Sequence, residues 1–266
     1  MVTRPRVALT IAGVDSGGGA GIGADLKTFE AHGVWGTSAV TAVTAQDTTG
    51  VHAVHVVPAA IVAAQIEAVL GDIGVDAVKT GMLATGAIVD AVATVLPADA
   101  RLVVDPVLVS TSGTPLLEPD AVGTLRDHLL ARATVVTPNL AEAAVLTGAA
   151  PIVDRAGMAE AAQALVALGA AVVMVTGGHL AGDPVDCIAA AGERDVRWIE
   201  GRRIDNAGAH GSGCVLSAAI AAELARGMEP IDACVAAKRF VEGAIAAAVD
   251  IGRGGAPVDP GWQSRA

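Results

Sequence analysis

Aromatic residues are scarce in this sequence. Its 266 residues include no tyrosine, and phenylalanine and tryptophan together make up only 2%. Proteins that bind single-stranded nucleic acid stack successive bases on aromatic side chains, and the chain offers few such platforms. The net charge of −11 also opposes binding to nucleic-acid backbones and to anionic membrane surfaces. We therefore expect a small-molecule partner, with no nucleic acid and no membrane bound.

Cysteine is also rare, and its three positions are Cys187, Cys214 and Cys234. The odd number and wide spacing fit neither a disulfide framework nor a C-x-x-C metal site. Residues 1–6 lead into a strand-like run without the apolar segment of a signal peptide. No stretch of ~18 uninterrupted apolar residues predicts a membrane span. We expect a cytoplasmic protein.

Strand-like and helix-like patterns alternate through most of the chain. Apolar runs such as 7–12 read as buried strands, and longer patterns such as 155–168 read as helices. A hairpin is predicted over 186–199, at one edge of the sheet. The alternation predicts an α/β fold with a mainly parallel central sheet and helices on both faces. With no repeat and no linker, residues 1–266 are predicted to form a single domain.

Residues 211–214, Gly-Ser-Gly-Cys, precede a helical pattern that ends at Gly227. Glycines at a helix entrance let backbone amides converge on an anion, which the positive end of the helix dipole attracts. The same field would lower the pKa of a thiol in the first turn, so Cys214 is a candidate base beside a bound phosphate. The alternative is structural, with Ser212 as a helix cap and Cys214 as a small buried residue.

Residues 13–21 form a glycine-rich loop between a strand and a helix, an arrangement typical of ligand-binding sites. The spacing fits neither the dinucleotide-binding G-x-G-x-x-G pattern nor the P-loop, so both are disfavoured. Later in the chain, Asn139 and Glu142 have the spacing of a capping box, which explains both residues structurally. The functional alternative is that they, with Asp105 at a neighbouring strand end, supply oxygen ligands to Mg²⁺.

The polar and glycine-rich segments share one position, the carboxyl end of a predicted strand. In parallel sheets these ends meet at one rim, where ligands bind. An anion site, candidate Mg²⁺ ligands and a base are the parts required for phosphoryl transfer to an alcohol. A cysteine hydrolase is the competing interpretation and would require His179 or His210 beside Cys214. A binding module without catalysis is the third, and it would not need Cys214.

Seven motifs follow one another along nearly the whole chain: IAGVDSGGGAGI at 11–22, TAQDT at 44–48, VKTGM at 78–82, VDPV at 104–107, TPNLAEA at 137–143, GGH at 177–179 and HGSGC at 210–214. They resemble those of the bifunctional hydroxymethylpyrimidine/phosphomethylpyrimidine kinases of thiamin biosynthesis, in the ribokinase superfamily. The resemblance implies a three-layer ribokinase-like fold, ATP and Mg²⁺ as co-substrates, and a homodimer. It also implies phosphorylation of 4-amino-5-hydroxymethyl-2-methylpyrimidine and then of its monophosphate. The alternative is a kinase for pyridoxal, pyridoxine or a related hydroxymethylpyrimidine.

The resemblance also implies roles for individual residues. The aminopyrimidine would be hydrogen-bonded by Gln46 and surrounded by Gly13, Asp25, Met82 and Val107. The nucleotide would contact Asp105, Asn139, Thr176, Gly178 and His210, and the metal would be organised by Asp105 and Glu142. Gly211, Ser212 and Gly213 would form the anion hole, with Cys214 as the catalytic base.

Some positions depart from the family pattern. Thr176 stands where the family commonly has lysine, and Gly208 and Ala209 stand where it has an Asn-Thr pair. Gly255 replaces a histidine in a Gly-His-Gly-Pro segment, and Gly23 replaces a glutamine in the first helix. These positions surround the expected nucleotide and phosphate sites, so they bear on the second phosphorylation and on substrate identity.

Overall fold

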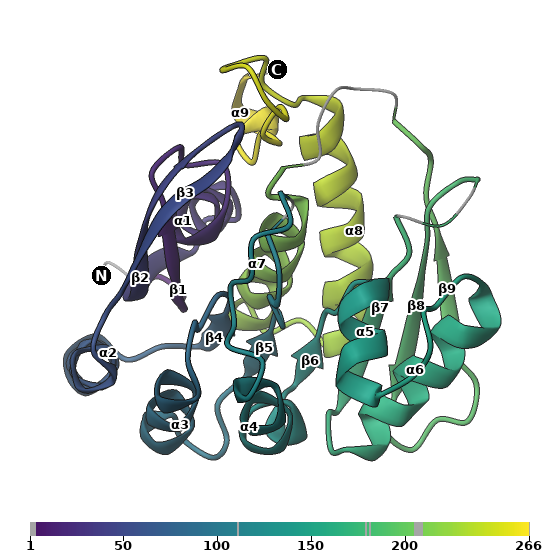
Figure 1. Ribbon diagram of the computed structural model, residues 1–266, viewed down its shortest axis with the longest axis horizontal. Coiled ribbons are helices and arrows are strands. Elements are labelled where there is room, and N and C mark those ends of the chain that lie inside the picture. The colour runs from purple at the N-terminus through teal and green to yellow at the C-terminus, as the bar shows by residue number, and fades with distance from the viewer. Residues whose placement is uncertain (1–3, 111, 179, 181, 205–209, 266) are drawn as a thin grey trace.

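The computed structural model describes residues 4–110, 112–178, 180, 182–204 and 210–265. His179, Gly208 and Ala209, which the sequence analysis singled out, lie outside these residues. Within the described part of the chain the strands form one nine-stranded sheet in the order β3-β2-β1-β4-β5-β6-β7-β8-β9 (Figure 1). The strands are β1 Val7–Asp15, β2 Trp35–Asp47, β3 Gly50–Val56, β4 Ala77–Thr80, β5 Leu102–Val104, β6 Val135–Val136, β7 Val172–Thr176, β8 Val185–Ala190 and β9 Arg197–Glu200.

The central strands, from β2 to β7 in the sheet order, run parallel. The edge strands β3, β8 and β9 pair antiparallel with their neighbours, and β8 with β9 forms the predicted hairpin. The strands β5 and β6 are wholly apolar, and β4 is completely buried, because both faces of the sheet are covered. The predicted mainly parallel sheet is confirmed.

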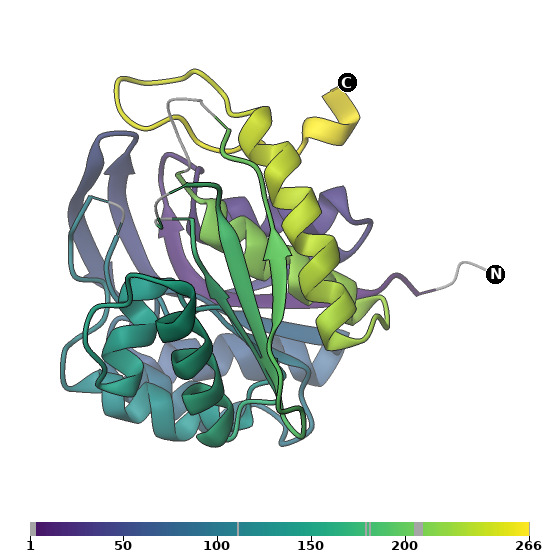
Figure 2. The ribbon, with the colours of Figure 1, turned by 90° about the vertical axis from the view of Figure 1, so that its right-hand side faces the viewer.

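Helices cover both faces of the sheet. They are α1 Gly21–Ala31, α2 Ala59–Ala68, α3 Gly86–Val95, α4 Ala121–His128, α5 Leu140–Thr147, α6 Arg155–Ala167, α7 Ser212–Ala225, α8 Pro230–Ala246 and α9 Trp262–Arg265, with a π-helical turn at Val69–Ile73 and a 3₁₀ turn at Leu130–Arg132. Helices α1, α7 and α8 pack on one face, and α2 to α6 on the other. Figure 2 shows this division at the β8–β9 edge, where α8 lies on one side and the α5–α6 pair on the other.

Two apolar cores fill the spaces between these layers. One joins Leu9, Val78 and Val104 to the helices α2 to α6, and the other joins Val103 and Met174 to α7 and α8. Helix α7 is buried continuously from Val215 to Ala225 because the sheet, α1 and α8 enclose it. Its many alanines allow this close approach. A helix enclosed in this way holds its N-terminus at a fixed place beside the strand ends.

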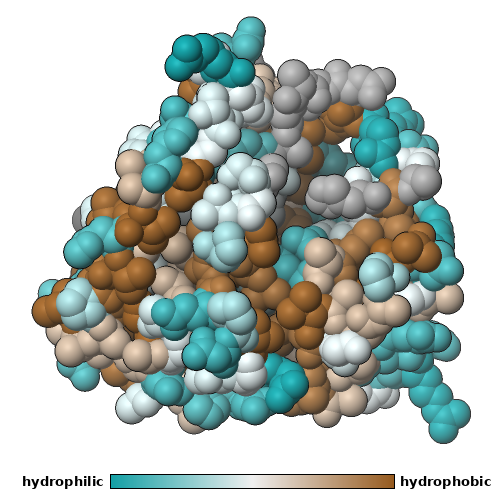
Figure 3. All heavy atoms as spheres, viewed as in Figure 1, coloured by the Kyte–Doolittle hydropathy of each residue, from teal (hydrophilic) through white to brown (hydrophobic). Residues whose placement is uncertain are grey.

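The β2–β3 ribbon protrudes from the sheet at the upper left of Figure 1. Apolar surface extends over the left-hand part of the same view in Figure 3, and Val43, Val54 and Val56 of the ribbon are exposed. Among the described residues, no helix combines the length and the apolar composition that a membrane span requires.

Local sequence signals explain several element boundaries. Asn139 and Glu142 form a complete capping box at the start of α5, as predicted. Asp154 and Thr85 cap α6 and α3 in the same way, each with a side-chain oxygen that accepts an N–H three residues later. Strand β1 extends further than predicted, through Asp15, because residues 13–15 continue to pair with β2 after a register shift.

Candidate active site

A cavity of about 310 Å³ lies at the carboxyl ends of the parallel strands. Most of the residues singled out in the sequence line it: Gly13, Gln46, Met82, Asp105, Val107, Asn139, Glu142, Thr176, His210, Gly211, Ser212, Gly213 and Cys214. Asp25 and Gly178 are outside this lining. The structure therefore brings segments from the whole length of the chain together at one rim, where the sequence placed them.

The N-terminus of α7 opens onto this cavity. Gly211 occupies the cap position in the left-handed conformation, with φ +83°. The first bond of the helical ladder runs from the Val215 N–H to the Gly211 carbonyl, so the amides of residues 212 to 214 have no acceptor within the helix. Ser212 is the first helical residue, not the cap that the structural alternative assigned to it, and its side chain makes no cap bond. This end can receive an anion on its backbone amides.

Asp15 fixes the glycine loop beside that helix end. Its carboxylate accepts hydrogen bonds from the backbone N–H groups of Gly17, Gly19 and Ala20 at 2.7–3.0 Å. The His210 ring nitrogen Nε2 lies 3.4 Å from the same carboxylate. Burial raises the pKa of Asp15, but His210 and the backbone donors outweigh burial and lower it. Asp15 is thus an ionised anchor, which leaves it unsuited to act as a base.

Gln46 lies at the end of β2 with its side chain on the cavity. Ser16 holds the backbone there, because its hydroxyl donates to the Gln46 carbonyl and accepts from the Gln46 N–H. The Thr44 hydroxyl donates to Gln46 Oε1 at 3.1 Å, which orients the amide. Opposite, a Cβ atom at Gly13 would approach the Met82 sulfur within 3.0 Å, so glycine leaves space at this wall.

Lys79 forms part of the cavity floor and is completely buried. Its ammonium lies 2.9 Å and 3.1 Å from the two carboxylate oxygens of Asp25, and 3.9 Å from Asp105. The Thr10 hydroxyl donates to Asp25 at 2.6 Å. Asp25 lies below the cavity because this pairing draws it into the core. The expectation that Asp25 surrounds the pyrimidine ring beside Gln46 stays a prediction, since Asp25 is buried outside the cavity lining.

Two carboxylates line the cavity wall: Asp105 directly follows β5, and Glu142 lies in the first turn of α5. The Ser217 hydroxyl donates to Asp105 at 2.9 Å. Glu142 accepts the Asn139 N–H at 2.9 Å in the capping box. Burial raises the pKa of both, and the charge of Asp105 contributes to a value of about 8 for Glu142. Two buried carboxylates that repel one another favour a cation between them.

The donor set fits magnesium. Mg²⁺ prefers oxygen ligands and is commonly bound by one or two carboxylates together with substrate phosphates. Asp105 and Glu142 supply such carboxylates, and the buried Thr137 hydroxyl on the same wall has no hydrogen-bond partner among the described residues. No group of three His, Cys, Asp or Glu side chains in the described part of the chain is arranged for a metal. A metal held here would therefore need further ligands from the nucleotide.

Cys214 lies in the first turn of α7 and is partly buried. Burial raises the pKa of its thiol to about 12, and the charges of Asp105 and Asp25 act in the same direction. Lys79 and the Gly21 N–H act in the opposite direction and lower it less. The expectation of a lowered thiol pKa at this helix end is therefore wrong for the free protein, because burial and the two carboxylates outweigh Lys79 and the Gly21 N–H.

Of the two histidines that a cysteine hydrolase could use beside Cys214, the described part of the chain contains only His210. His210 precedes the anion site, but its ring is paired with Asp15.

The residues expected to contact a nucleotide lie at the end of β7. Thr176 ends this strand and forms an isolated bridge with Asn139. Gly178 is exposed beyond Thr176. Gly255 is another departure from the family pattern. A Cβ atom added to it would lie 4.0 Å from the His210 Cβ.

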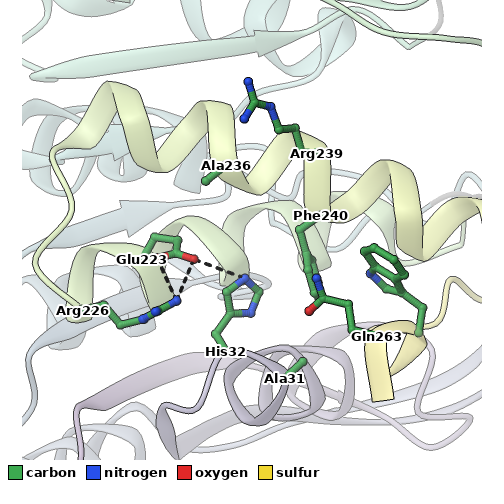
Figure 4. A pocket seen from close by; sticks show the side chains of 9 residues that line it. Ala31, His32, Glu223, Arg226, Ala236, Arg239, Phe240 and Gln263 are labelled. Carbon is green, nitrogen blue, oxygen red and sulfur yellow. Dashed lines mark hydrogen bonds and ion pairs between the residues drawn. The ribbon is translucent and has the colours of Figure 1, made fainter. Parts of the chain in front are cut away.

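A second cavity of about 450 Å³ lies away from the strand ends, between α1, α7, α8 and α9 (Figure 4). Its polar groups pair with one another: His32 Nε2 is 3.8 Å from Glu223, and Glu223 is 3.2 Å from Arg226. The His32 ring packs on Phe240 with centroids 4.3 Å apart, and burial lowers the pKa of His32. This cavity lacks the open helix N-terminus and the candidate oxygen ligands that line the cavity at the strand ends. The cavity at the strand ends is therefore the candidate active site.

Sequence reasoning missed Lys79 as a functional candidate. It was interpreted as one residue of a short strand, although a lysine between Val78 and Thr80 in an otherwise apolar strand is itself a signal. Buried lysines are rare unless they are paired. The partner Asp25 is 54 residues away in the sequence, so no local pattern connects the two.

The chain has clear relatives among known proteins. A family model described as phosphomethylpyrimidine kinase matches residues 15–259. A hydroxymethylpyrimidine/phosphomethylpyrimidine kinase of Rhizobium meliloti is 52% identical over 255 residues, covering 95% of this chain and 96% of the relative. The thiamine biosynthesis bifunctional protein ThiED of Geobacter sulfurreducens is 48% identical over 254 residues, covering 94% of this chain and 51% of that protein. A solved ADP complex of Bacillus subtilis pyridoxal kinase has a TM-score of 0.91 at 38% identity, covering 98% of this chain and 99% of that chain.

Proposed function

The chain belongs to the phosphomethylpyrimidine kinase family and has its ribokinase-like fold, and we propose that it phosphorylates a hydroxymethylpyrimidine twice. The first acceptor is 4-amino-5-hydroxymethyl-2-methylpyrimidine, and the second is the phosphate of its monophosphate. ATP is the donor, in thiamin biosynthesis. The observation that carries the proposal is the meeting of Gln46, the α7 N-terminus and Cys214 in one cavity.

Different residues of the chain bind the pyrimidine and the phosphates. The Gln46 amide pairs with ring nitrogen and amino groups, while Gly13, Met82 and Val107 flank the ring. The amides of residues 212 to 214 receive the transferred phosphoryl group, whose charge they stabilise without reorganising. Thr176, Gly178, His210 and Asn139 contact the nucleotide. Asp105 and Glu142 would hold Mg²⁺, which would neutralise phosphate charge.

Phosphoryl transfer joins the substrate hydroxyl oxygen to the γ-phosphorus while the bond from that phosphorus to the departing ADP oxygen breaks. The hydroxyl proton goes to Cys214, which is the acceptor nearest to the anion site on α7. To accept it, the Cys214 thiol must first release its own proton to solvent in the cavity. Lys79 and the Gly21 N–H favour that loss, against burial and the nearby carboxylates. Asp15 and Asp25, the alternative bases, are already paired with His210 and with Lys79.

Release of ADP on addition of Mg-ATP and the hydroxymethylpyrimidine tests the assignment. No release with the pyrimidine or its monophosphate would contradict it. A pyridoxal kinase is the second candidate, supported by the fold similarity to Bacillus subtilis pyridoxal kinase. The higher identity to the pyrimidine kinase of Rhizobium meliloti, 52%, favours the first.

Assembly and location belong to the same proposal. A homodimer is supported by the exposed valines of the protruding β2–β3 ribbon, Val43, Val54 and Val56, which a second copy would cover. Sedimentation at the mass of one chain would contradict it. A reducing cytoplasm is supported by three free cysteines, of which Cys187 and Cys234 are buried.

A further inference from the structure

Lys79 is a wholly buried cation at the floor of the reaction cavity. Its side chain and that of Asp25 are both 0% exposed. Every other residue of β4 is apolar or uncharged, and the strand lies in the centre of the sheet between β1 and β5. The ammonium is therefore held at a place where the surrounding fold offers no solvent to stabilise it.

The Lys79 ammonium has contacts both on the side of the core and on the side of the cavity. Below, both oxygens of Asp25 accept from the ammonium at 2.9 Å and 3.1 Å, and Thr10 fixes Asp25 in turn. Toward the cavity, Asp105 lies 3.9 Å from the ammonium, and Cys214 lines the same cavity as Lys79. Gly81 leaves space for this approach, since a Cβ there would come within 2.9 Å of the ammonium.

Fold stability alone does not explain this arrangement. Replacing a buried ion pair by apolar residues of similar volume is often neutral or stabilising, because desolvation offsets the attraction. The pair lies directly beneath the metal ligand and the base of the proposed reaction. Asp25 holds the Lys79 ammonium from the core side, and on the cavity side the same ammonium lies 3.9 Å from the Asp105 carboxylate.

We propose that Lys79, fixed by Asp25, is a positioning residue that holds Asp105 and Cys214 at the reaction centre. This inference rests on the proposed function, because it assigns Lys79 to the phosphoryl-transfer step. The fixed positive charge keeps both groups in place while the hydroxyl oxygen attacks the γ-phosphorus. Because the role assigned to Lys79 is to position a group of the reaction centre, we expect its loss to affect turnover more than binding.

The test removes both charges together, in the double variant Asp25→Asn/Lys79→Met. This change removes both members of the buried ion pair, and Asp105 keeps its hydrogen bond from Ser217, so the variant should retain a cooperative melt. We expect kcat to fall roughly 10²- to 10³-fold, the range for loss of one preorganised electrostatic group. The KM values for ATP and for the pyrimidine should change less than threefold. A kcat close to that of the unchanged protein would show that the pair is only structural.

A matched control is the buried pair Lys238 and Asp186, 2.8 Å apart, between α8 and β8. Asp186→Asn/Lys238→Met removes equal charges, and asparagine still accepts the Gly177 N–H that Asp186 accepts at 3.0 Å. We expect its kcat to remain within threefold of the unchanged protein. An equal loss of kcat in this control would attribute the effect to lost buried charge in general and overturn the proposal.

If the double variant does not fold, the single variant Asp25→Asn tests the proposal instead. It keeps the ammonium but loosens its anchor, so kcat should fall about tenfold with KM unchanged, and an unchanged kcat overturns the proposal. The unchanged protein is assayed first with the pyrimidine and with pyridoxal. Activity with pyridoxal alone contradicts the proposed function, and the variants are then compared on pyridoxal, which still tests Lys79.

Discussion

Gly211 lies against the carbonyl oxygen of Gly19, so closely that a Cβ atom added to Gly211 would collide with that oxygen. Residue 19 belongs to the loop after β1, and residue 211 to the start of α7. The two glycine-rich segments of the sequence thus form a single joint. The joint leaves the amides of the helix N-terminus open to the cavity.

Substitution of Gly211 should break this joint. Gly211→Ala forces a side chain into the left-handed conformation, which costs roughly 1–2 kcal/mol, and adds the collision with Gly19. We expect a melting temperature lower by several degrees and loss of phosphoryl transfer. Gly213→Ala is the stability control, because its Cβ would meet no described protein atom within 4 Å. Equal melting temperatures for both variants and the unchanged protein would contradict the role of the joint.

Replacing the base should reduce turnover without weakening nucleotide binding. Cys214→Ser keeps the approximate size of the side chain and the backbone amides of α7 but replaces the thiol by a hydroxyl that ionises far less readily. We expect kcat to fall roughly 10²- to 10⁴-fold, the usual range for a general base. The Kd for Mg-ATP, measured by calorimetry, should stay within a few-fold. Near-normal turnover would show that the thiol is only packing.

The Cys214 thiol should react slowly at neutral pH. Because its pKa is raised to about 12, the thiolate is a small fraction at pH 7 and grows about tenfold with each pH unit. The rate of alkylation by iodoacetamide should therefore still be rising at about pH 10. Cys214→Ser is the control and should lose this labelling, since Cys187 and Cys234 are buried. A plateau below about pH 8.5 would contradict the dominance of burial.

The capping box and the metal role of Glu142 can be separated. Glu142→Gln keeps an oxygen that accepts the Asn139 N–H at the start of α5, so the melting temperature should hardly change. The lost charge should raise the Mg²⁺ concentration needed for half-maximal activity by roughly tenfold, as for removal of one of two carboxylates. If activity depends on Mg²⁺ identically in both proteins, Glu142 is only a capping residue.

The sequence was sufficient for features that depend on neighbouring residues. The capping box of Asn139 and Glu142 and the β8–β9 hairpin follow from local spacing. The gathering of Gln46, Asp105 and the α7 N-terminus at one rim follows from the topology of parallel strands, which alternation predicts.

What the sequence did not show depends on contacts between distant residues. The pairing of Lys79 with Asp25 joins positions 54 residues apart in the sequence. It holds Asp25 in the core, outside the lining of the cavity. The raised pKa of Cys214 comes from burial that the sheet, α1 and α8 impose on α7. A helix end lowers the pKa of an exposed thiol, but no sequence pattern gives the degree of burial that opposes it.

The most direct test of the account is product analysis with Mg-ATP and three acceptors offered separately. They are 4-amino-5-hydroxymethyl-2-methylpyrimidine, its monophosphate, and pyridoxal. The cavity's combination of Gln46 with an open helix N-terminus predicts that mass spectrometry will detect the pyrimidine monophosphate first and then the diphosphate. Formation of pyridoxal phosphate, with neither pyrimidine product, would contradict the account.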